Sequence, residues 1–403
     1  MHSASLLDGI RVVEIAQWIA VPSAMAVLAD WGAEVIKVEH PERGDGLRGY
    51  IPYHPIEPGQ MNYIWELANR NKKSVTANLQ SEEGRDIVYR LIKNSDVFVS
   101  NLRPYELNRY QLDYSSLANI NPRLVWANLT GYGTEGPDCD LPGYDYCAFW
   151  ARSGIMNTLP EPGMPPPTAR PGLGDSLTSL NLAGAVMAAL FHRERTGFGQ
   201  RVEVSLFHTA VWGMGMDIQS VLSTGTEVSQ VPRRMVTNPL WNYYQCKDGR
   251  WLMLVLLQPD PYWARFCQAI EREDLRDDPR FNSFESRTRN NEELIRILDT
   301  VFASKTLDEH AERLNTLGLP WARVQKVEEV INDVQAKAND FFVDFEHPSF
   351  GPVRLVNSPI KFSRTPASVR APAPELGQHT EEVLTAIGYS WEEIAQFKEK
   401  GAI

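Results

Sequence analysis

Short runs of β-branched residues alternate with helical segments over the first hundred residues, and no other feature limits the fold as strongly. Strands that are joined by helical crossovers pair in parallel, and helices then cover both faces of the sheet. The expected strands and helices alternate over residues 10–15, 22–31, 35–38, 75–79, 82–93 and 97–100. The sequence therefore predicts an α/β fold with a parallel sheet.

The turn after the first expected strand covers residues 16–21 and reads AQWIAV. Dinucleotide-binding folds carry GxGxxG at this point, because glycine lets the backbone approach the pyrophosphate. That fingerprint is missing here, so the turn gives no indication of a dinucleotide ligand.

A second conspicuous segment runs from Pro171 to Ser176 and places Asp175 just before apolar residues at helical spacing. Its two glycines leave room beside the carboxylate. The N–H groups and the dipole of a helix N-terminus favour an ionised acid. Asp175 is therefore expected to be charged and approachable, as a carboxylate nucleophile must be. Taken by itself, the segment favours a simpler alternative, in which Asp175 only caps a core helix.

Composition narrows the classes of protein that fit. With 403 residues, 43% of them hydrophobic and 23% charged, the chain is typical of globular proteins and long enough for two or three domains. Its net charge of −11 argues against nucleic acid as a partner. No apolar run approaches the length that spans a bilayer, and the first nine residues lack the layout of a signal peptide. The expected location is the cytoplasm, with no membrane partner.

The four cysteines show neither CxxC spacing nor a pairing with nearby histidines, so neither a metal site nor a disulfide is expected. They are Cys139, Cys147, Cys246 and Cys267. We interpret them as reduced, mostly structural thiols.

The pattern of elements changes after Gly225. A strand pair with an Asp-Gly turn is expected over residues 243–257, and helices follow as far as about residue 324. A helix over residues 327–339 and strands over residues 353–362 then leave this segment. We therefore expect a large domain from residues 1–224 and 327–403, with a small α+β domain of residues 225–326 inserted between its two parts.

Four cations stand beside expected strands: Lys72, Lys73, Arg103 and Arg109. Open parallel sheets bind ligands at the carboxyl ends of their strands, so these cations are candidates for binding an anionic ligand. The alternative is that they are solvated loop residues, as basic side chains usually are.

Several dispersed motifs give the chain a family likeness over nearly its whole length. They are LDGIRVVE at 7–14, DWGAEVIKVE at 30–39, NKKS at 71–74, GD at 174–175, TGFGQ at 196–200 and GYS at 388–390. With these motifs the chain resembles the class III CoA-transferases, the family of formyl-CoA:oxalate CoA-transferase. The resemblance implies a Rossmann-like large domain built from both chain ends, a small α+β domain, and two copies interlocked as a homodimer.

The resemblance also implies an activity, the movement of CoA from an acyl-CoA to a carboxylic acid. Asp175 matches the family's nucleophilic aspartate, which forms an anhydride and then an aspartyl-CoA thioester. A CoA thioester is then a substrate, and neither a permanently bound cofactor nor a metal is expected. The implied CoA-binding positions are Ile19, Ala20, Lys72, Lys73, Asn101, Leu102, Arg103 and Arg109.

One departure from the oxalate enzyme narrows the substrate. Residues 231–241 read VPRRMVTNPLW where that enzyme has a glycine-rich loop, so oxalate is not the expected acceptor. Segments 15–22, 140–146 and 149–154 look most like the branch that acts on 2-hydroxy acids and their enoyl-CoA partners, such as cinnamoyl-CoA:phenyllactate CoA-transferase. Aromatic candidates for the wall of an apolar acyl pocket are Trp18, Phe149 and Trp150.

Two alternatives stay open. The first is a racemase, because the α-methylacyl-CoA racemases also resemble this chain. Those enzymes have a histidine base at the position where this chain has Tyr144. Tyrosine is a poor base at neutral pH, which argues against a racemase. A CoA-binding protein without turnover is the other alternative, and the intact Gly174-Asp175 pair argues against it. The sequence favours a CoA-transferase over both.

Overall fold

The computed structural model describes residues 5–50 and 60–403 of the chain. The described chain forms two compact units. Unit 1 lies within residues 1–157, 167–226 and 338–403, and unit 2 lies within residues 158–166 and 227–337. The expected domain limits, at 224/225 and 326/327, stay a prediction about which parts fold independently.

Unit 1 is built on a six-stranded sheet in which every neighbouring pair of strands is parallel. The strands lie in the order β3-β2-β1-β4-β5-β6. From β1 the chain adds β2 and β3 on one side, and it then adds β4, β5 and β6 on the other, so the strand order reverses between β1 and β4. Open sheets bind ligands at such a switch point. The strands are β1 (Arg11–Ile15), β2 (Glu34–Glu39), β3 (Lys72–Thr76), β4 (Val97–Ser100), β5 (Val125–Thr130) and β6 (Arg201–Ser205). The predicted α/β fold with a parallel sheet is confirmed.

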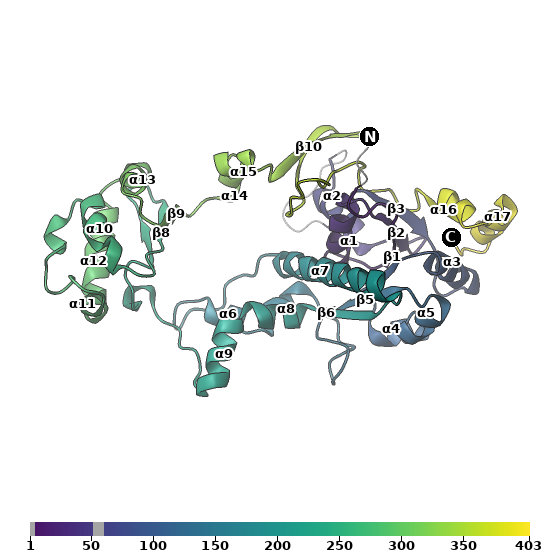
Figure 1. Cartoon of the computed structure of the whole chain (residues 1–403), viewed down its shortest axis with the longest axis horizontal. Coiled ribbons are helices and arrows are strands. Elements are labelled where there is room, and N and C mark those ends of the chain that lie inside the picture. Colours follow the sequence, from purple (N-terminus) through teal and green to yellow (C-terminus); the bar gives the residue numbers. More distant parts are fainter. Residues whose placement is uncertain (1–4, 51–59) are drawn as a thin grey trace. The chain divides into compact units, whose positions relative to one another are not determined.

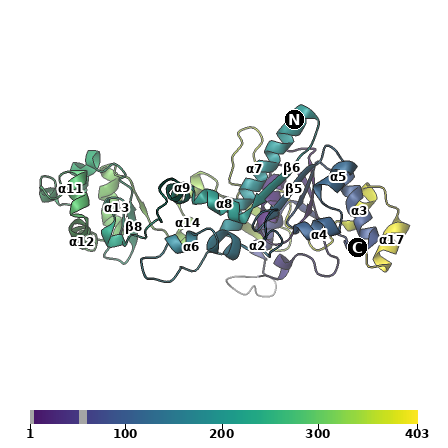
Figure 2. The ribbon, with the colours of Figure 1, turned by 90° about the horizontal axis from the view of Figure 1, so that it is seen from below.

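Helices cover both faces of this sheet, because successive strand residues point to opposite sides and both sides are apolar. Val12 belongs to the core on one face and Val13 to the core on the other, and both are completely buried. The first face is covered by α1 (Ala20–Asp30), α7 (Leu173–Thr196) and α8 (Leu206–Gly213). The second is covered by α3 (Glu82–Lys93), α4 (Pro104–Arg109), α5 (Tyr114–Ile120), α16 (Thr380–Ala386) and α17 (Trp391–Glu399), as Figures 1 and 2 show.

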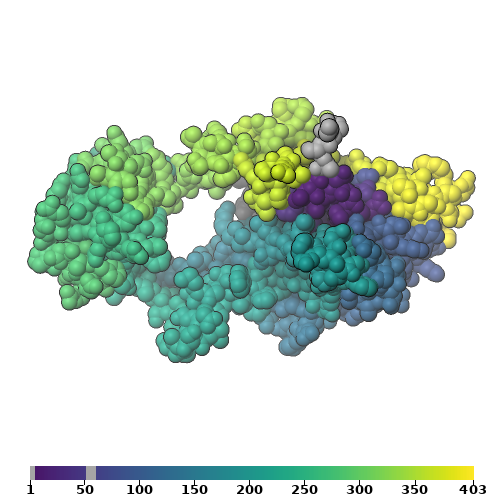
Figure 3. Space-filling view, viewed as in Figure 1, coloured from purple at the N-terminus to yellow at the C-terminus, as the bar shows by residue number. Residues whose placement is uncertain are grey.

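The end of the chain returns to the beginning of unit 1. The N–H of Asn78 donates to the carbonyl of Ala402, and Lys400 pairs with Glu83 at 2.6 Å. In Figure 3 the C-terminal residues, in yellow, accordingly lie beside the purple and blue N-terminal ones. Further elements are η1 (Gly46–Gly49), α2 (Tyr63–Asn69), η2 (Asp145–Ala151), α6 (Ile155–Thr158), α9 (Gly215–Thr224), and the antiparallel pair β10 (Phe342–His347) and β11 (Gly351–Val356).

Unit 2 contains a three-stranded antiparallel sheet, in the order β7-β8-β9, with helices packed against it. The predicted hairpin with an Asp-Gly turn is confirmed, and Gln245 pairs with Trp251 in it. The strands are β7 (Tyr243–Gln245), β8 (Trp251–Leu254) and β9 (Trp321–Arg323). The helices are η3 (Arg233–Met235), η4 (Asp260–Tyr262), α10 (Trp263–Ala269), η5 (Glu273–Leu275), α11 (Phe284–Arg289), α12 (Asn291–Phe302) and α13 (Leu307–Thr316).

The predicted helix over residues 327–339 is wrong, because two short helices stand there, α14 (Val327–Val330) and α15 (Val334–Ala338). The Asp333 carboxylate accepts hydrogen bonds from the N–H groups of Gln335 and Ala336. Aspartate capping of this kind starts a new helix and so divides the segment.

Helix α7 is long and apolar enough, by length and composition, to cross a bilayer, contrary to the expectation from the sequence. Its residues Leu182, Val186 and Leu190 are buried in the core of unit 1 with residues of α1 and β5. The core helix of a globular protein can have the same composition as a membrane span, and core packing accounts for these three residues of α7. Leu177 and Phe191 of the same helix are 46% and 65% exposed.

Four charged side chains of unit 1 are completely buried together, and we call them the buried charge cluster: Glu14, Lys37, Asp45 and Lys72. Lys37 on β2 lies 2.8 Å from Glu14 on β1 and 2.9 Å from Asp45. Lys72 on β3 lies 2.7 Å from the other oxygen of Glu14. Burial opposes the charge of Lys37, but Asp45, Glu14 and Glu39 together raise its pKa. The two positive charges balance the two negative ones, which is the condition for burying them.

We predict that Lys37→Met destabilises the protein by about 3–5 kcal/mol, because it leaves an unpaired buried charge. The measurement is the free energy of unfolding by chemical denaturation. The matched control is Lys361→Met, which removes an exposed lysine paired with Asp340 at 3.1 Å, and it is expected to change stability by less than about 1 kcal/mol. Equal stability of the two variants would show that the cluster does not hold the fold.

Candidate active site

Asp175 is the third residue of α7, and the predicted delivery of a carboxylate at a helix start is confirmed. The preceding Gly172 has φ 72°, a left-handed conformation that favours glycine. Gly174 is required for a different reason. A side chain there would come within 2.2 Å of Asp145 Oδ1 and 2.3 Å of the Phe149 ring. The two glycines thus let α7 begin directly against η2.

The electrostatics of Asp175 differ from the expectation of an ordinary ionised acid. Burial, followed by the charge of Asp145, raises the pKa of Asp175 to about 7. Burial also raises the pKa of Asp145, although the N–H groups of Gly172 and Gly174 oppose this. The favourable helix terminus is evident from the sequence, whereas the second carboxylate beside it is evident only from the structure. Asp175 is therefore a more basic carboxylate than a helix start alone would make it.

Asp175 lines a cavity of about 80 Å³ that is walled mainly by the loops after β1, β4 and β5. Trp18, Leu141, Tyr144 and Leu206 also line it. The Trp18 ring packs edge-on against Tyr144, with 6.0 Å between ring centres. Trp18 has φ 69°, which costs free energy in a residue with a side chain, and its N–H donates to Asp45 Oδ1 at 3.0 Å. The wall of the cavity beside the carboxylate is thus apolar and aromatic in part, and polar where Gln17, Asn101 and Arg103 line it.

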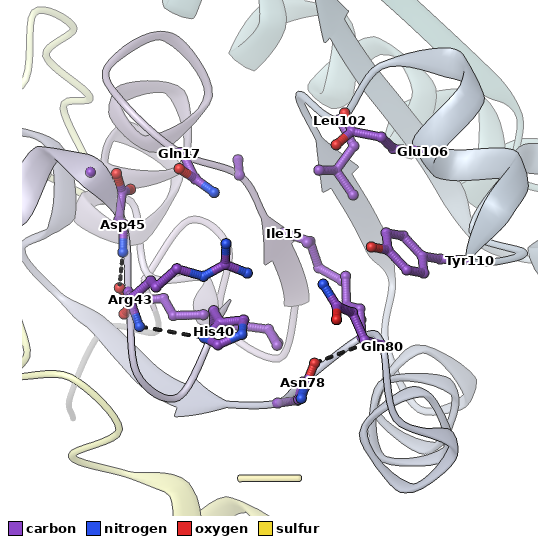
Figure 4. A pocket seen from close by; sticks show the side chains of 17 residues that line it. Ile15, Gln17, His40, Arg43, Asp45, Asn78, Gln80, Leu102, Glu106 and Tyr110 are labelled. Atoms are coloured by element: carbon purple, nitrogen blue, oxygen red, sulfur yellow. Dashed lines mark hydrogen bonds between the residues drawn. The ribbon is translucent and has the colours of Figure 1, made fainter. Parts of the chain in front are cut away.

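A second cavity, of about 370 Å³, lies at the carboxyl ends of β1, β2 and β3 and beside the start of the loop after β4. This is the switch point of the sheet. Figure 4 shows Gln17, His40, Arg43 and Asp45 on one side of it, with Leu102, Glu106 and Tyr110 on the other. His40 Nδ1 accepts hydrogen bonds from the N–H groups of Glu42 and Arg43, and burial and the Arg43 charge lower its pKa. A neutral ring and a cation therefore face this cavity.

Gln17 lines both cavities, so the two are neighbours along the loop after β1. Asn101 fixes this loop to the one after β4. Its Oδ1 accepts from the N–H of Gln17 at 3.1 Å, and its Nδ2 donates to the Gln17 carbonyl at 2.7 Å. Gln17, held by Asn101, therefore stands at the boundary between the two cavities.

The structure brings half of the implied CoA-binding residues to these cavities. Ala20, Asn101 and Arg103 line the smaller cavity with Asp175, and Leu102 lines the larger one. Ile19 lies beside them, since its Cδ1 is 3.3 Å from where a Gly172 side chain would stand. Arg109 lies outside both cavities and packs its guanidinium 5.4 Å from the ring of Tyr110, which lines the larger one.

Lys72 and Lys73 lie away from both cavities. The expected strand began at Val75, but β3 begins at Lys72, so the two lysines point to opposite sides of the sheet. Lys72 belongs to the buried charge cluster, and burial lowers its pKa to about 8. Lys73 pairs with Glu34 and Glu382 at 3.2 and 2.7 Å. The sequence placed the start of this strand three residues late, and for that reason it predicted both lysines in a loop at the ligand site.

The sequence points to neither Asp145 nor Arg43 as a site residue, and to His40 only as the residue that stands where the formyl-CoA:oxalate enzyme has an arginine. Asp145 stands in a quoted motif beside Tyr144, but the sequence does not show that this motif packs on the start of α7, some thirty residues later. His40 and Arg43 follow β2, and their position at the carboxyl end of a parallel strand was the available signal.

Comparison with known proteins gives consistent similarities over the whole chain. The model of CoA-transferase family III matches residues 7–380. (R)-2-hydroxy-4-methylpentanoate CoA-transferase from Clostridioides difficile is 39% identical over 402 residues, 99% of each chain. Cinnamoyl-CoA:phenyllactate CoA-transferase from Clostridium sporogenes is 36% identical over 401 residues, 98% of this chain and 97% of that one. A CAIB/BAIF family protein from Brucella suis has a crystal structure with a TM-score of 0.84 and 28% identity, covering 95% of this chain and 100% of its own.

We predict that Asp175→Asn makes the protein more stable at pH 8. The folded pKa of about 7 exceeds the ordinary value of 3.8, so the folded state holds the proton more tightly than the unfolded state. The free energy of unfolding therefore falls as pH rises from about 4 to about 7, then levels off. Asparagine does not ionise and escapes this loss. Its advantage is expected to grow by about 2–3 kcal/mol between pH 5 and pH 8.

The control for this prediction is Asp138→Asn, which removes a carboxylate paired with Arg152 at 2.6 Å and 33% exposed. It is expected to show no such gain. Chemical denaturation at the two pH values measures both variants. An Asp175→Asn advantage that is the same at pH 5 and pH 8 would contradict the raised pKa.

Proposed function

This chain belongs to CoA-transferase family III, and from that premise we propose that it moves CoA from an acyl-CoA to a 2-hydroxy acid through covalent intermediates on Asp175. The observation that carries the proposal is the placement of Asp175. It is a basic carboxylate at a helix start, in a cavity next to a larger one at the switch point of a parallel sheet.

The proposed reaction begins when an Asp175 carboxylate oxygen attacks the thioester carbonyl of the acyl-CoA. The C–S bond breaks, CoA leaves as a thiolate, and an acyl-aspartyl anhydride forms. The thiolate then attacks the aspartyl carbonyl, which releases the first acid and leaves an aspartyl-CoA thioester. The acceptor carboxylate runs the same two steps in reverse and regenerates Asp175. Each step exchanges one activated acyl group for another, so burial of the site has to exclude water as a competitor.

We propose the larger cavity as the site of the CoA nucleotide. It lies where open α/β sheets bind nucleotides. Arg43 is exposed at this cavity and makes no ion pair within the described chain, so it is available for a phosphate. His40 and Tyr110 offer flat rings for an adenine. Lys72, by contrast, is proposed to act in the buried charge cluster and not on a phosphate.

The proposed substrates follow from the relatives and from the wall of the smaller cavity. The two relatives above are named for 2-hydroxy-4-methylpentanoate and phenyllactate, which are 2-hydroxy acids with bulky apolar groups. Trp18, Tyr144 and Leu141 give this chain an apolar wall beside Asp175. Phe149 and Trp150, the other expected wall residues, are 5% and 7% exposed in the core and do not line the cavity. We therefore propose Trp18 as the main aromatic contact for the acyl group.

We also propose that the protein is a cytoplasmic homodimer. The family resemblance implies two interlocked copies. On unit 1, Trp212 and Met216 of α8 and α9 are 83% and 90% exposed. Large apolar side chains that are this exposed, on two consecutive helices, support an interface with another chain.

We predict that Asp175→Ala abolishes CoA transfer while the protein stays folded and still binds CoA. Removal of a covalent nucleophile is expected to lower kcat by about 10⁴-fold or more. Asp175→Asn keeps the size of the side chain and is expected to be equally inactive. The measurement is the exchange of labelled CoA between an acyl-CoA and free acids, with CoA binding followed by calorimetry.

The same assay separates the alternatives. A bulky 2-hydroxy acid is expected to accept CoA well and oxalate poorly, and an equal rate for both would refute the substrate part of the proposal. A racemase would exchange the α-proton of acyl-CoA with solvent deuterium and would not need a free acid. Transfer by Asp175→Ala above trace level would remove the covalent mechanism.

A further inference from the structure

Asp145 is a buried carboxylate that the proposed chemistry at Asp175 leaves without a role. It begins η2 and is 5% exposed. Its Oδ1 lies over the first turn of α7, so near that a side chain on Gly174 would come within 2.2 Å of it. Asp145 and Asp175 also line the same cavity. Two carboxylates therefore share one small site.

Asp145 has no hydrogen-bonded cation as a partner among the described residues. Neither of its oxygens makes a hydrogen bond of good geometry in the part of the chain that the structure describes. Burial raises the pKa of Asp145, and the nearby N–H groups of Gly172 and Gly174 oppose this from the end of the helix. Gly172 is the capping residue of α7 and has no side chain to perform that function. Asp145 thus supplies the negative group that this helix end lacks.

We propose that Asp145 is a positioning residue for the nucleophile: its carboxylate lies over the first turn of α7 and places beside Asp175 a negative charge. The repulsion between the two carboxylates ends when Asp175 is protonated or acylated. The inference rests on the proposed role of Asp175 as the nucleophile. Asp145 acts through Asp175 and forms no bond to the substrate.

The charge of Asp175 changes during the proposed reaction. Attack on the thioester converts its carboxylate into a neutral anhydride, and the thiolate converts the anhydride into a neutral thioester. Both covalent forms are free of the repulsion between two carboxylates, and regeneration of the free enzyme restores it. The repulsion therefore raises the free energy of the resting enzyme relative to both intermediates. It also makes Asp175 more basic, and so a stronger nucleophile.

Among the residues that the structure describes, no other titratable group at the cavity explains the basicity of Asp175. The remaining titratable side chains at the cavity are Arg103, Cys139 and Tyr144. Arg103 lies 3.1 Å from Glu106, its own partner. Burial and Asp145 are the two causes that raise the pKa of Asp175, with burial the larger. Removal of the Asp145 charge therefore leaves only the effect of burial.

The test is Asp145→Asn, which keeps the size of the side chain and removes its charge. In the wild-type enzyme, acylation of Asp175 is expected to be half-maximal near pH 7. In Asp145→Asn the pH at which acylation of Asp175 is half-maximal, which we call the acylation midpoint, is expected to fall. The ratio of aspartyl-CoA to free enzyme at pH 8 is expected to fall about tenfold for each pKa unit lost. Rapid-quench mass spectrometry with acyl-CoA and no acceptor measures both quantities.

Two further variants complete the test. Asp145→Glu keeps the charge and is expected to retain a midpoint near that of the wild type, whereas a merely structural role would predict damage from its extra length. Asp138→Asn removes a carboxylate outside the cavity and is expected to change nothing. Should Asp145→Asn not fold, Asp145→Ser keeps a capping oxygen without the charge and is expected to show the same shift.

The outcomes distinguish this inference from the proposed function. A midpoint that stays in place in folded Asp145→Asn, while aspartyl-CoA still forms, would overturn the role of Asp145 alone. Absence of any covalent form in the wild-type enzyme during transfer would overturn the proposed nucleophile. A midpoint that shifts in Asp145→Asn and returns in Asp145→Glu would support both.

Discussion

The ammonium of Lys37 holds together the part of unit 1 on which the site depends. It donates to Glu14 on β1 and to the carbonyl of Ala16 just after it, and it pairs with Asp45. Asp45 in turn accepts the N–H of Trp18. A single buried cation therefore fixes the loop after β1 in a conformation that Trp18 would not adopt unaided. Because that loop lines both cavities, the geometry of the proposed ligand site is set below the surface, within the sheet.

The buried charge cluster and the pair at α7 represent opposite uses of buried charge. In the cluster every charge has an opposite partner within 3 Å, which stabilises a particular arrangement of strands. At the start of α7 two carboxylates line one cavity, and no ion pair holds either of them among the described residues. Burial raises the pKa of both. The first arrangement gives rigidity. The second stores free energy in the resting enzyme, and stability is commonly lost in this way at functional sites.

Local signals in the sequence predicted much of the fold. The helix over residues 82–93 and the strand over residues 97–100 have the predicted limits, because capping residues and apolar runs are local features. The position of Asp175 at a helix start was predicted for the same reason. What the sequence did not reveal depends on contacts between distant segments. The sequence placed Lys72 beside a strand, whereas Lys72 lies inside β3. It also gave no sign that Asp145 lies against α7. Burial of a charged residue and contact with a residue thirty positions away do not appear in the hydrophobic periodicity of a sequence.

The central claim is that Asp175 becomes a CoA thioester during turnover, and chemical trapping tests it most directly. Hydroxylamine added during transfer should convert the thioester to a hydroxamate on Asp175, and borohydride should reduce it to an alcohol. Peptide mass spectrometry should find either product on the α7 peptide only when an acyl-CoA is present, and a bulky 2-hydroxy acid should discharge it. An unmodified Asp175 peptide, under conditions in which labelled CoA is passing between acids, would contradict the account.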